Sequence, residues 1–483
     1  MAGSRRHLTA MARELASRPV RLAHEHGLID PQTRFFDFGC GRGADIAWLQ
    51  SEGITAAGWD PAHRPKSRKT KSEVIGLTFV VNVIEDPVER ASVVREAWDL
   101  AKSLLIVSAR LVGERDDSHV KPRSDGWMTN RGTFQRFFEH HELGEWINEV
   151  LGASAVPAAP GIWYVFRRTS DREEFLSRRY MMRLPVPHQR KSDKRFQQHR
   201  AILQELIDFF AQNGRIPVEE ELHFGPQINE AFGSIGKAFR AVEVVTDREE
   251  WLKLTERRRI DLLVYLAMKF FDGSFRMKDL PSTVQRNVRA HFQSLSNATA
   301  TAEKLLYGVG KLDNISMACR SSGVGKLTPS ALYVHIDAFE HLPAILKVYE
   351  GCARRLVGEI PGANLIKLHR DDKKISYLSY PDFDENPHPG LARSDVVDLV
   401  AQRHQARLYE ATANVPILHR KEEFVHRSDP RWQPFRDLTN HEVSLGLYAD
   451  PSRIGYREYW NDLIGGLDPA LQGQFLSQTP CLQ

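Results

Sequence analysis

The chain has 483 residues, of which 42% are hydrophobic and 27% charged, with 25 prolines and 32 glycines. This composition excludes a disordered or collagen-like protein, and at about 150 residues per domain the length predicts about three folded units. The net charge of +4 at neutral pH is too small to imply a nucleic-acid partner by itself, although clustered charges could.

The four cysteines are sparse, and no CxxC pair or Cys/His spacing typical of zinc occurs. No stretch of about 18 apolar residues exists, and the N-terminal segment lacks the apolar core of a signal peptide. We therefore expect a cytoplasmic protein that is neither exported nor membrane-spanning.

Residues 1–168 alternate short apolar runs with amphipathic ones, a pattern typical of strands and helices in a mostly parallel α/β sheet. The predicted strands lie at 34–38, 54–60, 74–84, 104–109 and 161–166, the last one antiparallel at the sheet edge. The predicted helices lie at 7–26, 44–51 and 89–102. We expect this part to form a Rossmann-like domain.

The remainder divides by charge and periodicity into a basic linker at 169–195, a mainly helical segment at 196–310 and a mixed α+β domain at 311–483. Residues 167–200 hold 11 Lys/Arg against 4 Asp/Glu, and within them Lys191, Lys194 and Arg195 are candidate nucleic-acid contacts. A helix is expected at 342–357 and a hairpin at 363–380. No long internal repeat is visible.

The segment Phe35-Phe36-Asp37-Phe38-Gly39-Cys40-Gly41-Arg42-Gly43 places a G-x-G-x-G turn between a predicted strand and a predicted helix. Glycines allow the backbone to pass close to a ligand. A dinucleotide site would have glycine where Ala44 stands, and a P-loop is excluded because no Gly-Lys-Ser/Thr follows. The turn therefore predicts a nucleotide-like cofactor of another kind.

An acidic residue before the turn, Asp37, suits a cofactor that offers a cation or amine, as S-adenosylmethionine does. Asp60 follows the loop by about 20 residues, at the end of the second strand, where a carboxylate can bind ribose hydroxyls. This arrangement resembles motif I of class I S-adenosylmethionine-dependent methyltransferases. The alternative is a glycine-rich turn with one solvated and one capping carboxylate.

The resemblance implies S-adenosylmethionine as cofactor and a set of residues that bind it at three consecutive strand ends. These residues are Asp37, Phe38, Gly39, Cys40, Gly41, Gly43, Asp60, Pro61, Asn82 and Val83. Residues 79–87 match neither the amino-methyltransferase motif nor the Pro-Cys of C5 enzymes, and Cys40 is a poor candidate for an attacking thiol. Glu85 is expected to cap the following helix, with a role as base the alternative. No catalytic residue is assigned.

Only thirteen residues separate Asp60 from Val74, so the helix and strand usual in this fold are predicted to be shortened or lost. Five Lys/Arg fall within eight residues of this loop. They are Arg64, Lys66, Arg68, Lys69 and Lys71. The loop either contacts phosphates or is a solvated surface loop.

Several further strings resemble the family of DNA phosphorothioation-associated putative methyltransferases. They lie at 58–61, 77–87, 129–135, 156–161, 326–335, 363–370, 378–384 and 416–422. The resemblance implies a methyltransferase acting on or with DNA in a modification and defence module. The expected partners are DNA, including phosphorothioate-modified DNA, and other proteins of that module. The alternative is a catalytically silent DNA-binding or assembly protein.

Two features of the remaining chain leave alternatives open. Residues 213–217 and 232–239 are similar to the helical repeats that accompany homing and HNH endonucleases, which implies DNA contact unless Phe232 and Phe239 are simply core residues. Asp382, Asp384 and His388 lie within seven residues and could serve a metal-dependent nuclease, or they form solvated turns. No metal site is assigned.

Overall fold

The computed structural model describes residues 6–9, 13, 15–115, 119–180, 198–409, 412, 414–450 and 453–466. Residue contacts group the chain into two compact units. The first contains Met1–Asp171, Val324–Ala338 and Cys352–Gln483, and the second contains Arg172–Gly323 and Phe339–Gly351. The four-part division expected from the sequence stays a prediction. Lys191, Lys194 and Arg195 lie outside the described residues.

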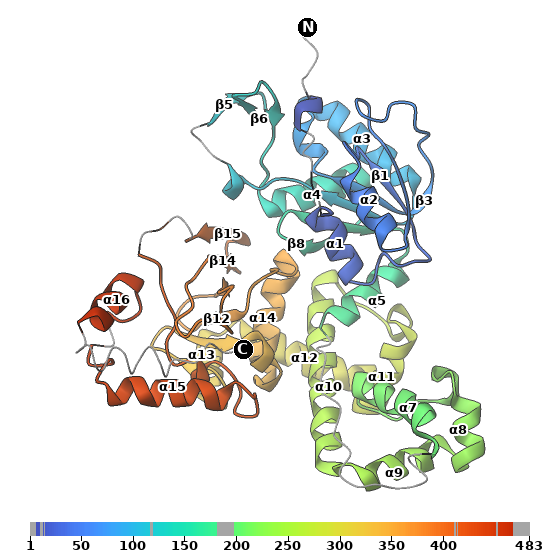
Figure 1. Cartoon of the computed structure of the whole chain (residues 1–483). Coiled ribbons are helices and arrows are strands. Elements are labelled where there is room, and N and C mark those ends of the chain that lie inside the picture. The colour runs from blue at the N-terminus through green and yellow to red at the C-terminus, as the bar shows by residue number, and fades with distance from the viewer. Residues whose placement is uncertain are drawn as a thin grey trace. The chain divides into compact units, whose positions relative to one another are not determined.

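The N-terminal part of the first unit is built on a six-stranded sheet with the order β2-β1-β3-β4-β9-β8. Strands β1, β3 and β8 of this sheet are labelled in Figure 1. Its strands are β1 (Arg34–Phe38), β2 (Thr55–Trp59), β3 (Ser72–Thr78), β4 (Ala101–Ser108), β8 (Val156–Ala159) and β9 (Ile162–Phe166). β2, β1, β3 and β4 run parallel, whereas β9 is antiparallel to β4. This confirms the predicted Rossmann-like α/β architecture.

The predicted edge position of β9 is wrong, because β8 pairs with it on the outer side and forms the edge. β8 gives a weak sequence signal since it is four residues long and contains Pro157. Proline cannot donate a hydrogen bond to a neighbouring strand, so within sheets it is confined largely to edges.

Four helices accompany this sheet: α1 (Arg18–Glu25), α2 (Ala44–Ser51), α3 (Pro87–Leu100) and α4 (His140–Leu151). The buried core between the strands and α3 and α4 contains Phe36, Ile75, Leu105, Val94 and Ile147. The leading helix expected at 7–26 is shorter than predicted. α1 begins only at Arg18, because proline at position 19 has no backbone N–H to donate and therefore fits only the first turn of a helix.

The prediction that Glu85 caps α3 is wrong, because the cap is the next residue, Asp86. The side chain of Asp86 accepts a 2.9 Å hydrogen bond from the backbone N–H of Val88 and caps α3. Glu85 instead accepts a 2.9 Å bond from Nε of Arg123. Aspartate is the better cap because its shorter side chain reaches the first free amides of the helix.

A small three-stranded sheet lies between β4 and α4 in the sequence, with the order β5-β6-β7. Its strands are β5 (Val120–Arg123), β6 (Gly126–Thr129) and β7 (Phe134–Gln135). The sequence analysis did not predict these strands, which contribute to the cavity described below.

The C-terminal part of the first unit is an antiparallel meander with the order β10-β11-β12-β13-β14-β15. Its strands are β10 (Lys326–Leu327), β11 (Ala331–His335), β12 (Leu365–His369), β13 (Lys374–Ser379), β14 (Arg393–Asp398) and β15 (Arg403–Leu408). Among the residues described beyond Gly323, the α-helices are α14 (Ala344–Val357), which is divided between the two units after Gly351, α15 (Trp432–Ser444) and α16 (Arg457–Gly465). The predicted β12–β13 hairpin, the helix at 342–357 and the mixed α+β character are confirmed.

The second unit is helical, as predicted. Together with α5 (Thr169–Arg179) its helices are α7 (Arg200–Asn213), α8 (Gly225–Phe232), α9 (Ile235–Val245), α10 (Arg248–Lys269), α11 (Ser282–Phe292), α12 (Leu295–Val309) and α13 (Leu312–Arg320). Phe232 and Phe239 are buried core residues. No helix within the described ranges is long and apolar enough to cross a membrane.

The second unit also contains a repeated local pattern that the sequence analysis did not detect. α8 and α11 each end at a phenylalanine, followed by a left-handed residue, Gly233 (φ 78°) or Gln293 (φ 66°). Ser234 and Ser294 then cap α9 and α12 through 3.2 Å bonds from backbone amides. The two copies are about 60 residues apart, so the same helix–turn–helix connection occurs twice in this unit.

The cap of α3 generates a test with a neighbouring residue as control. Asp86→Ala is expected to lower the free energy of unfolding by about 1 kcal/mol, because an amide of the first turn loses its acceptor. Urea unfolding followed by circular dichroism measures the change. Glu85→Ala, which removes only an exposed ion pair, is expected to change it by less than about 0.5 kcal/mol. The reverse order would contradict the assignment of the cap.

Candidate cofactor site

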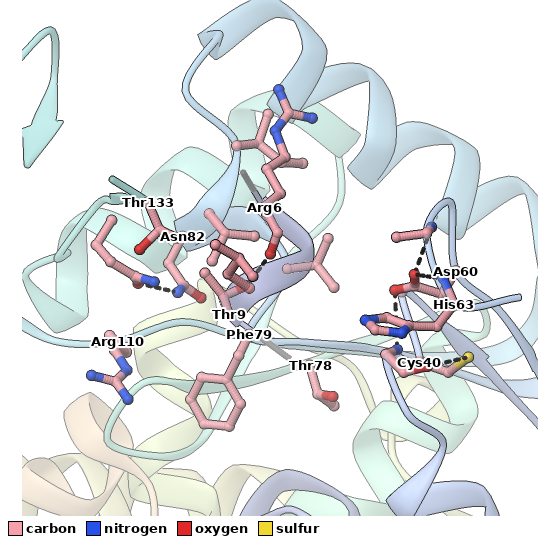
Figure 2. Close-up of a pocket in the computed structure, with 18 of the residues that line it drawn as sticks. Arg6, Thr9, Cys40, Asp60, His63, Thr78, Phe79, Asn82, Arg110 and Thr133 are labelled. Carbon is pink, nitrogen blue, oxygen red and sulfur yellow. Dashed lines mark hydrogen bonds between the residues drawn. The ribbon is translucent and has the colours of Figure 1, made fainter. Parts of the chain in front are cut away.

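A cavity of about 1120 Å³ opens at the carboxyl ends of β1, β2 and β3 (Figure 2). Ligands of open α/β sheets bind at this edge of the parallel strands. Nine of the ten predicted cofactor residues line the cavity: Asp37, Phe38, Gly39, Cys40, Gly41, Asp60, Pro61, Asn82 and Val83. Gly43 is not among the described lining residues, and its position in the turn explains why.

The glycine turn depends on left-handed backbone at three positions, with φ of 86° at Gly39, 49° at Gly41 and 85° at Gly43. Residues with a Cβ rarely adopt this conformation, so glycine is required there. Gly43 starts α2, and a Cβ on it would lie 2.5 Å from the guanidinium of Arg64. Gly43 therefore lies against the side chain of Arg64, whereas Gly39 and Gly41 line the cavity.

The carboxylate of Asp60 joins this turn to the loop after β2. One of its oxygens, Oδ2, accepts a 3.0 Å bond from the backbone N–H of Gly41, and Oδ1 accepts 2.8 Å bonds from those of Ala62 and His63. A carboxylate has about four acceptor positions, so Asp60 can still accept a bond from a ligand hydroxyl. Its first role is to hold two strand ends together.

The carboxyl group of Asp37 is buried and only 3% exposed. It is therefore not the solvated carboxylate of an ordinary glycine-rich turn, which was the alternative to a cofactor site. Within the described part of the chain, its Oδ1 has no hydrogen-bond partner. Burial, followed by the nearby charge of Asp45, raises the pKa of Asp37 well above its usual range. Asp45 accepts hydrogen bonds from Ser17 and Thr78, whereas Asp37 has the positive charges of Arg13 and Arg64 nearby, which only partly offset the effect of burial on its pKa.

Asn82 lies in the 3-10 helix Val81–Val83, because β3 ends at Thr78 and is shorter than the strand predicted at 74–84. Asn82 is 2% exposed and lies at the opposite end of the cavity from Asp60 in Figure 2. Its Nδ2 donates a 2.8 Å bond to Oε1 of Gln135, whereas its Oδ1 has no hydrogen-bond partner among the described residues. Phe79, which also lines the cavity, has φ of 56°. Such strain costs about 1–3 kcal/mol in a residue other than glycine and concentrates at ligand sites.

The candidate nucleophiles near the turn are unsuited to attack. Burial raises the pKa of the Cys40 thiol to about 12, so the sulfur stays protonated at neutral pH. This agrees with the sequence-based view of Cys40 as a poor nucleophile. Glu85 pairs with Arg123 and is not a cavity-lining residue among those described.

Sequence reasoning missed two walls of the cavity. The 3-10 helix Arg6–Thr9 contributes Arg6 and Thr9, and Arg6 pairs with Glu89 of α3. The segment that includes the small sheet contributes a polar wall made of Arg110, Glu114, His119, Thr129, Asn130, Arg131, Thr133 and Gln135. Residues 129–135 were noted only for their family resemblance, and no local pattern marked the N-terminal segment.

The basic loop after Asp60 has the predicted shortened form, since residues 60–71 are all described and contain no helix or strand between β2 and β3. Arg64, Lys66, Arg68 and Lys71 are exposed. Lys69 is half-buried, with Nζ 3.9 Å from the ring centroid of Trp59 and 2.5 Å from Oε1 of Glu96. Four of the five cations thus face solvent, while Lys69 is engaged within the domain.

The predicted Asp382, Asp384 and His388 cluster does not converge on one point. Asp384 accepts a 2.9 Å bond from Arg431, and Asp382 accepts a 2.7 Å bond from Asn386. Neither aspartate belongs, with His388, to a metal-capable group among the described residues. The metal-dependent nuclease suggested by this segment therefore lacks its two carboxylate ligands.

No model of a protein family matches the chain, and no curated protein matches it. Solved structures similar to it include a 1,6-didemethyltoxoflavin-N1-methyltransferase from Burkholderia thailandensis with bound S-adenosylhomocysteine (13% identity, TM-score 0.23, 31% of this chain and 74% of that one). A sugar N-methyltransferase from a Streptoalloteichus species is 15% identical (TM-score 0.25, 31% and 85%). A SAM-dependent methyltransferase from Aquifex aeolicus is 16% identical (TM-score 0.23, 31% and 88%). Nothing links the chain to phosphorothioation, so that family resemblance stays a prediction.

The Asp60 contacts predict a local effect that needs no ligand. In Asp60→Ala the amides of Gly41, Ala62 and His63 lose their acceptor. Hydrogen exchange in the two loops is therefore expected to accelerate at least fivefold, which corresponds to a decrease of about 1 kcal/mol in the free energy of local opening. Exchange mass spectrometry of peptides covering 38–45 and 60–66 measures this. Asp99→Asn, at an exposed position of α3, serves as control. Unchanged exchange in Asp60→Ala would contradict the linking role.

Proposed function

We propose that the chain is an S-adenosylmethionine-dependent methyltransferase whose cofactor binds in the cavity at the ends of β1–β3. The observation that carries the proposal is the buried carboxyl of Asp37, which lies beside a left-handed glycine turn and whose Oδ1 has no hydrogen-bond partner among the described residues. A buried carboxylate is stable only beside a positive charge or hydrogen-bond donors. S-adenosylmethionine offers both an amine and a sulfonium, whereas the phosphates of a dinucleotide would add negative charge at this position.

The lining residues divide into roles that match this cofactor. The ribose would be held by Asp60 through its remaining acceptor position, and the methionine moiety would lie against Gly39 and Gly41, near Asp37. When bound, S-adenosylmethionine supplies an electrophilic methyl group on a good leaving group, so the protein contributes mainly orientation. Asn82, with its free Oδ1, would orient an N–H or O–H of the methyl acceptor.

Binding of this cofactor is expected to depend on pH through Asp37. The pKa of Asp37 is raised in the free protein, chiefly by burial, and falls when a cation binds, so binding releases a proton and affinity increases as the pH rises toward the raised pKa of Asp37. Isothermal titration in two buffers of different ionisation enthalpy measures affinity and proton release. Asp37→Asn is expected to weaken binding at least tenfold, corresponding to about 1.4 kcal/mol, and to flatten the pH dependence.

Asp99→Asn serves as the control, because it removes one negative charge at an exposed position. This variant is expected to bind S-adenosylmethionine with the affinity of the unmodified chain. Absence of S-adenosylmethionine binding would overturn the proposal. Equal affinity of Asp37→Asn and the unmodified chain would overturn the role of the buried carboxyl.

We further propose that the methyl acceptor is DNA or a group processed on DNA, within a phosphorothioation-linked modification and defence module. Two observations support this. Several sequence segments resemble the phosphorothioation-associated family, and four exposed cations lie on the loop that begins at the cavity-lining residues Asp60 and His63. Cations on such a loop can neutralise phosphates and place a DNA strand at the opening.

The DNA proposal predicts a salt-dependent interaction that involves the basic loop. Removing two phosphate contacts in Arg68→Gln/Lys71→Gln is expected to reduce the slope of log affinity against log salt by about two. Filter binding across a salt series measures the slope. The double variant Arg403→Gln/Arg407→Gln removes two exposed cations from β15 and should leave it unchanged. Equal slopes for both double variants would contradict a role of the loop.

Transfer of tritiated methyl groups distinguishes the enzyme from a silent assembly protein. Plasmid DNA with and without phosphorothioate, RNA and cell extract are offered in parallel, and label is expected in DNA. Label only on protein or a small molecule would overturn the DNA acceptor. Cofactor binding without transfer to any of these acceptors would favour the catalytically silent alternative.

A further inference from the structure

Three side chains from separate segments of the C-terminal part converge on one point. His388 follows β13, His419 precedes the 3-10 helix Lys421–Glu423, and Glu442 belongs to α15. One ligand atom from each lies within 4.8 Å of the other two. The side chains of His388 and Glu442 are 10% and 1% exposed, and His419 is 6% exposed. The group is therefore enclosed by protein and is not a surface cluster.

Each of these side chains has one buried atom that makes no hydrogen bond within the described ranges: His388 Nε2, His419 Nδ1 and Glu442 Oε1. His388 Nε2 and Glu442 Oε1 contact each other as an ion pair, and His419 Nδ1 has no such contact with a described residue. A buried polar atom without a partner costs about 1–3 kcal/mol. A cation bound between the three side chains would satisfy all of these atoms together.

The opposite atom of each side chain is held in place. His388 Nδ1 lies 3.2 Å from the carbonyl oxygen of Leu418, and His419 Nε2 lies 2.6 Å from that of Ile454. The hydroxyl of Tyr448 donates a 2.6 Å bond to Glu442 Oε2. Metal-binding histidines commonly donate their other N–H to a carbonyl oxygen, which fixes the ring and directs the free nitrogen to the ion.

The closest pair of the three atoms forms an ion pair. His388 Nε2 and Glu442 Oε1 are 2.7 Å apart. Two tetrahedral ligands, each about 2.1 Å from a zinc ion, lie about 3.4 Å apart, so a bound ion would move this pair apart by less than about 1 Å. The Trp460 ring packs 4.5 and 4.4 Å from the two imidazole centroids and supplies the apolar surroundings that such sites favour.

We propose that His388, His419 and Glu442 bind a divalent transition-metal ion, with zinc the best match. Two imidazoles and one carboxylate form a zinc ligand set that leaves one position for water or another ligand. The ion would connect the loop after β13, the segment before the 3-10 helix and α15. Asp382 and Asp384 take no part, since both are bonded elsewhere.

The untagged full-length chain, stripped with a chelator and dialysed, tests the site. Isothermal titration with zinc is expected to show one ion per chain, and the melting temperature should rise when zinc is restored. Cobalt should bind in competition with zinc and produce visible absorption bands. Glu442→Gln, which keeps the shape of the side chain, and His419→Gln are each expected to lose at least tenfold in zinc affinity and most of the thermal shift.

Asp437→Asn is the matched control, because it removes an exposed carboxylate from the same helix and should bind zinc like the unmodified chain. Circular dichroism checks that each variant is folded, and His388→Gln replaces any that is not. Failure of the stripped chain to bind zinc, or full zinc binding by the folded ligand variants, would overturn the proposal. S-adenosylmethionine binding, measured in parallel, is expected to be independent of zinc.

Discussion

The carboxylate of Asp60 determines the geometry of the N-terminal cavity, because it bonds to the turn after β1 and to the loop after β2 at once. The left-handed glycines can adopt many conformations on their own, and these bonds select one. With the turn fixed, Asp37 is buried beneath it without a hydrogen bond to Oδ1 from any described residue. The cavity thus combines one carboxylate, Asp60, whose hydrogen bonds hold two loops together, with one buried carboxyl, Asp37, whose Oδ1 has no hydrogen-bond partner among the described residues.

The sequence predicts those parts of the fold that depend on local patterns. β1 and α2 match the predicted ranges because a buried apolar run, three glycines and an amphipathic run follow one another. The β12–β13 hairpin follows from two apolar runs around polar residues. Nine cofactor residues line the cavity because the glycine turn and the acid at the next strand end are local signals. Their roles toward a cofactor remain a proposal.

Other features depend on contacts between distant residues and leave no local pattern. The buried pairing of Asp45 with Ser17 joins positions 28 residues apart, and the N-terminal wall of the cavity has no recognisable motif. The repeated local pattern in the second unit consists of a left-handed residue followed by a serine cap. Such residues are common in ordinary turns, so the sequence does not distinguish this pattern from other turns. His388, His419 and Glu442 come together only through folding, while the obvious sequence cluster around Asp382 disperses.

The shortened connection between β2 and β3 has a consequence for solubility. Because no strand pairs with the outer side of β2 in the described sheet, β2 presents free backbone donors and acceptors at an edge. Such edges can template pairing with another chain, and proteins discourage this with charged side chains, lysine above all. The loop that replaces the missing elements carries four exposed cations, and Lys69 packs on Trp59 at the end of β2. Lys69 thus places one positive charge beside the end of this open edge, where it would disfavour pairing with another chain.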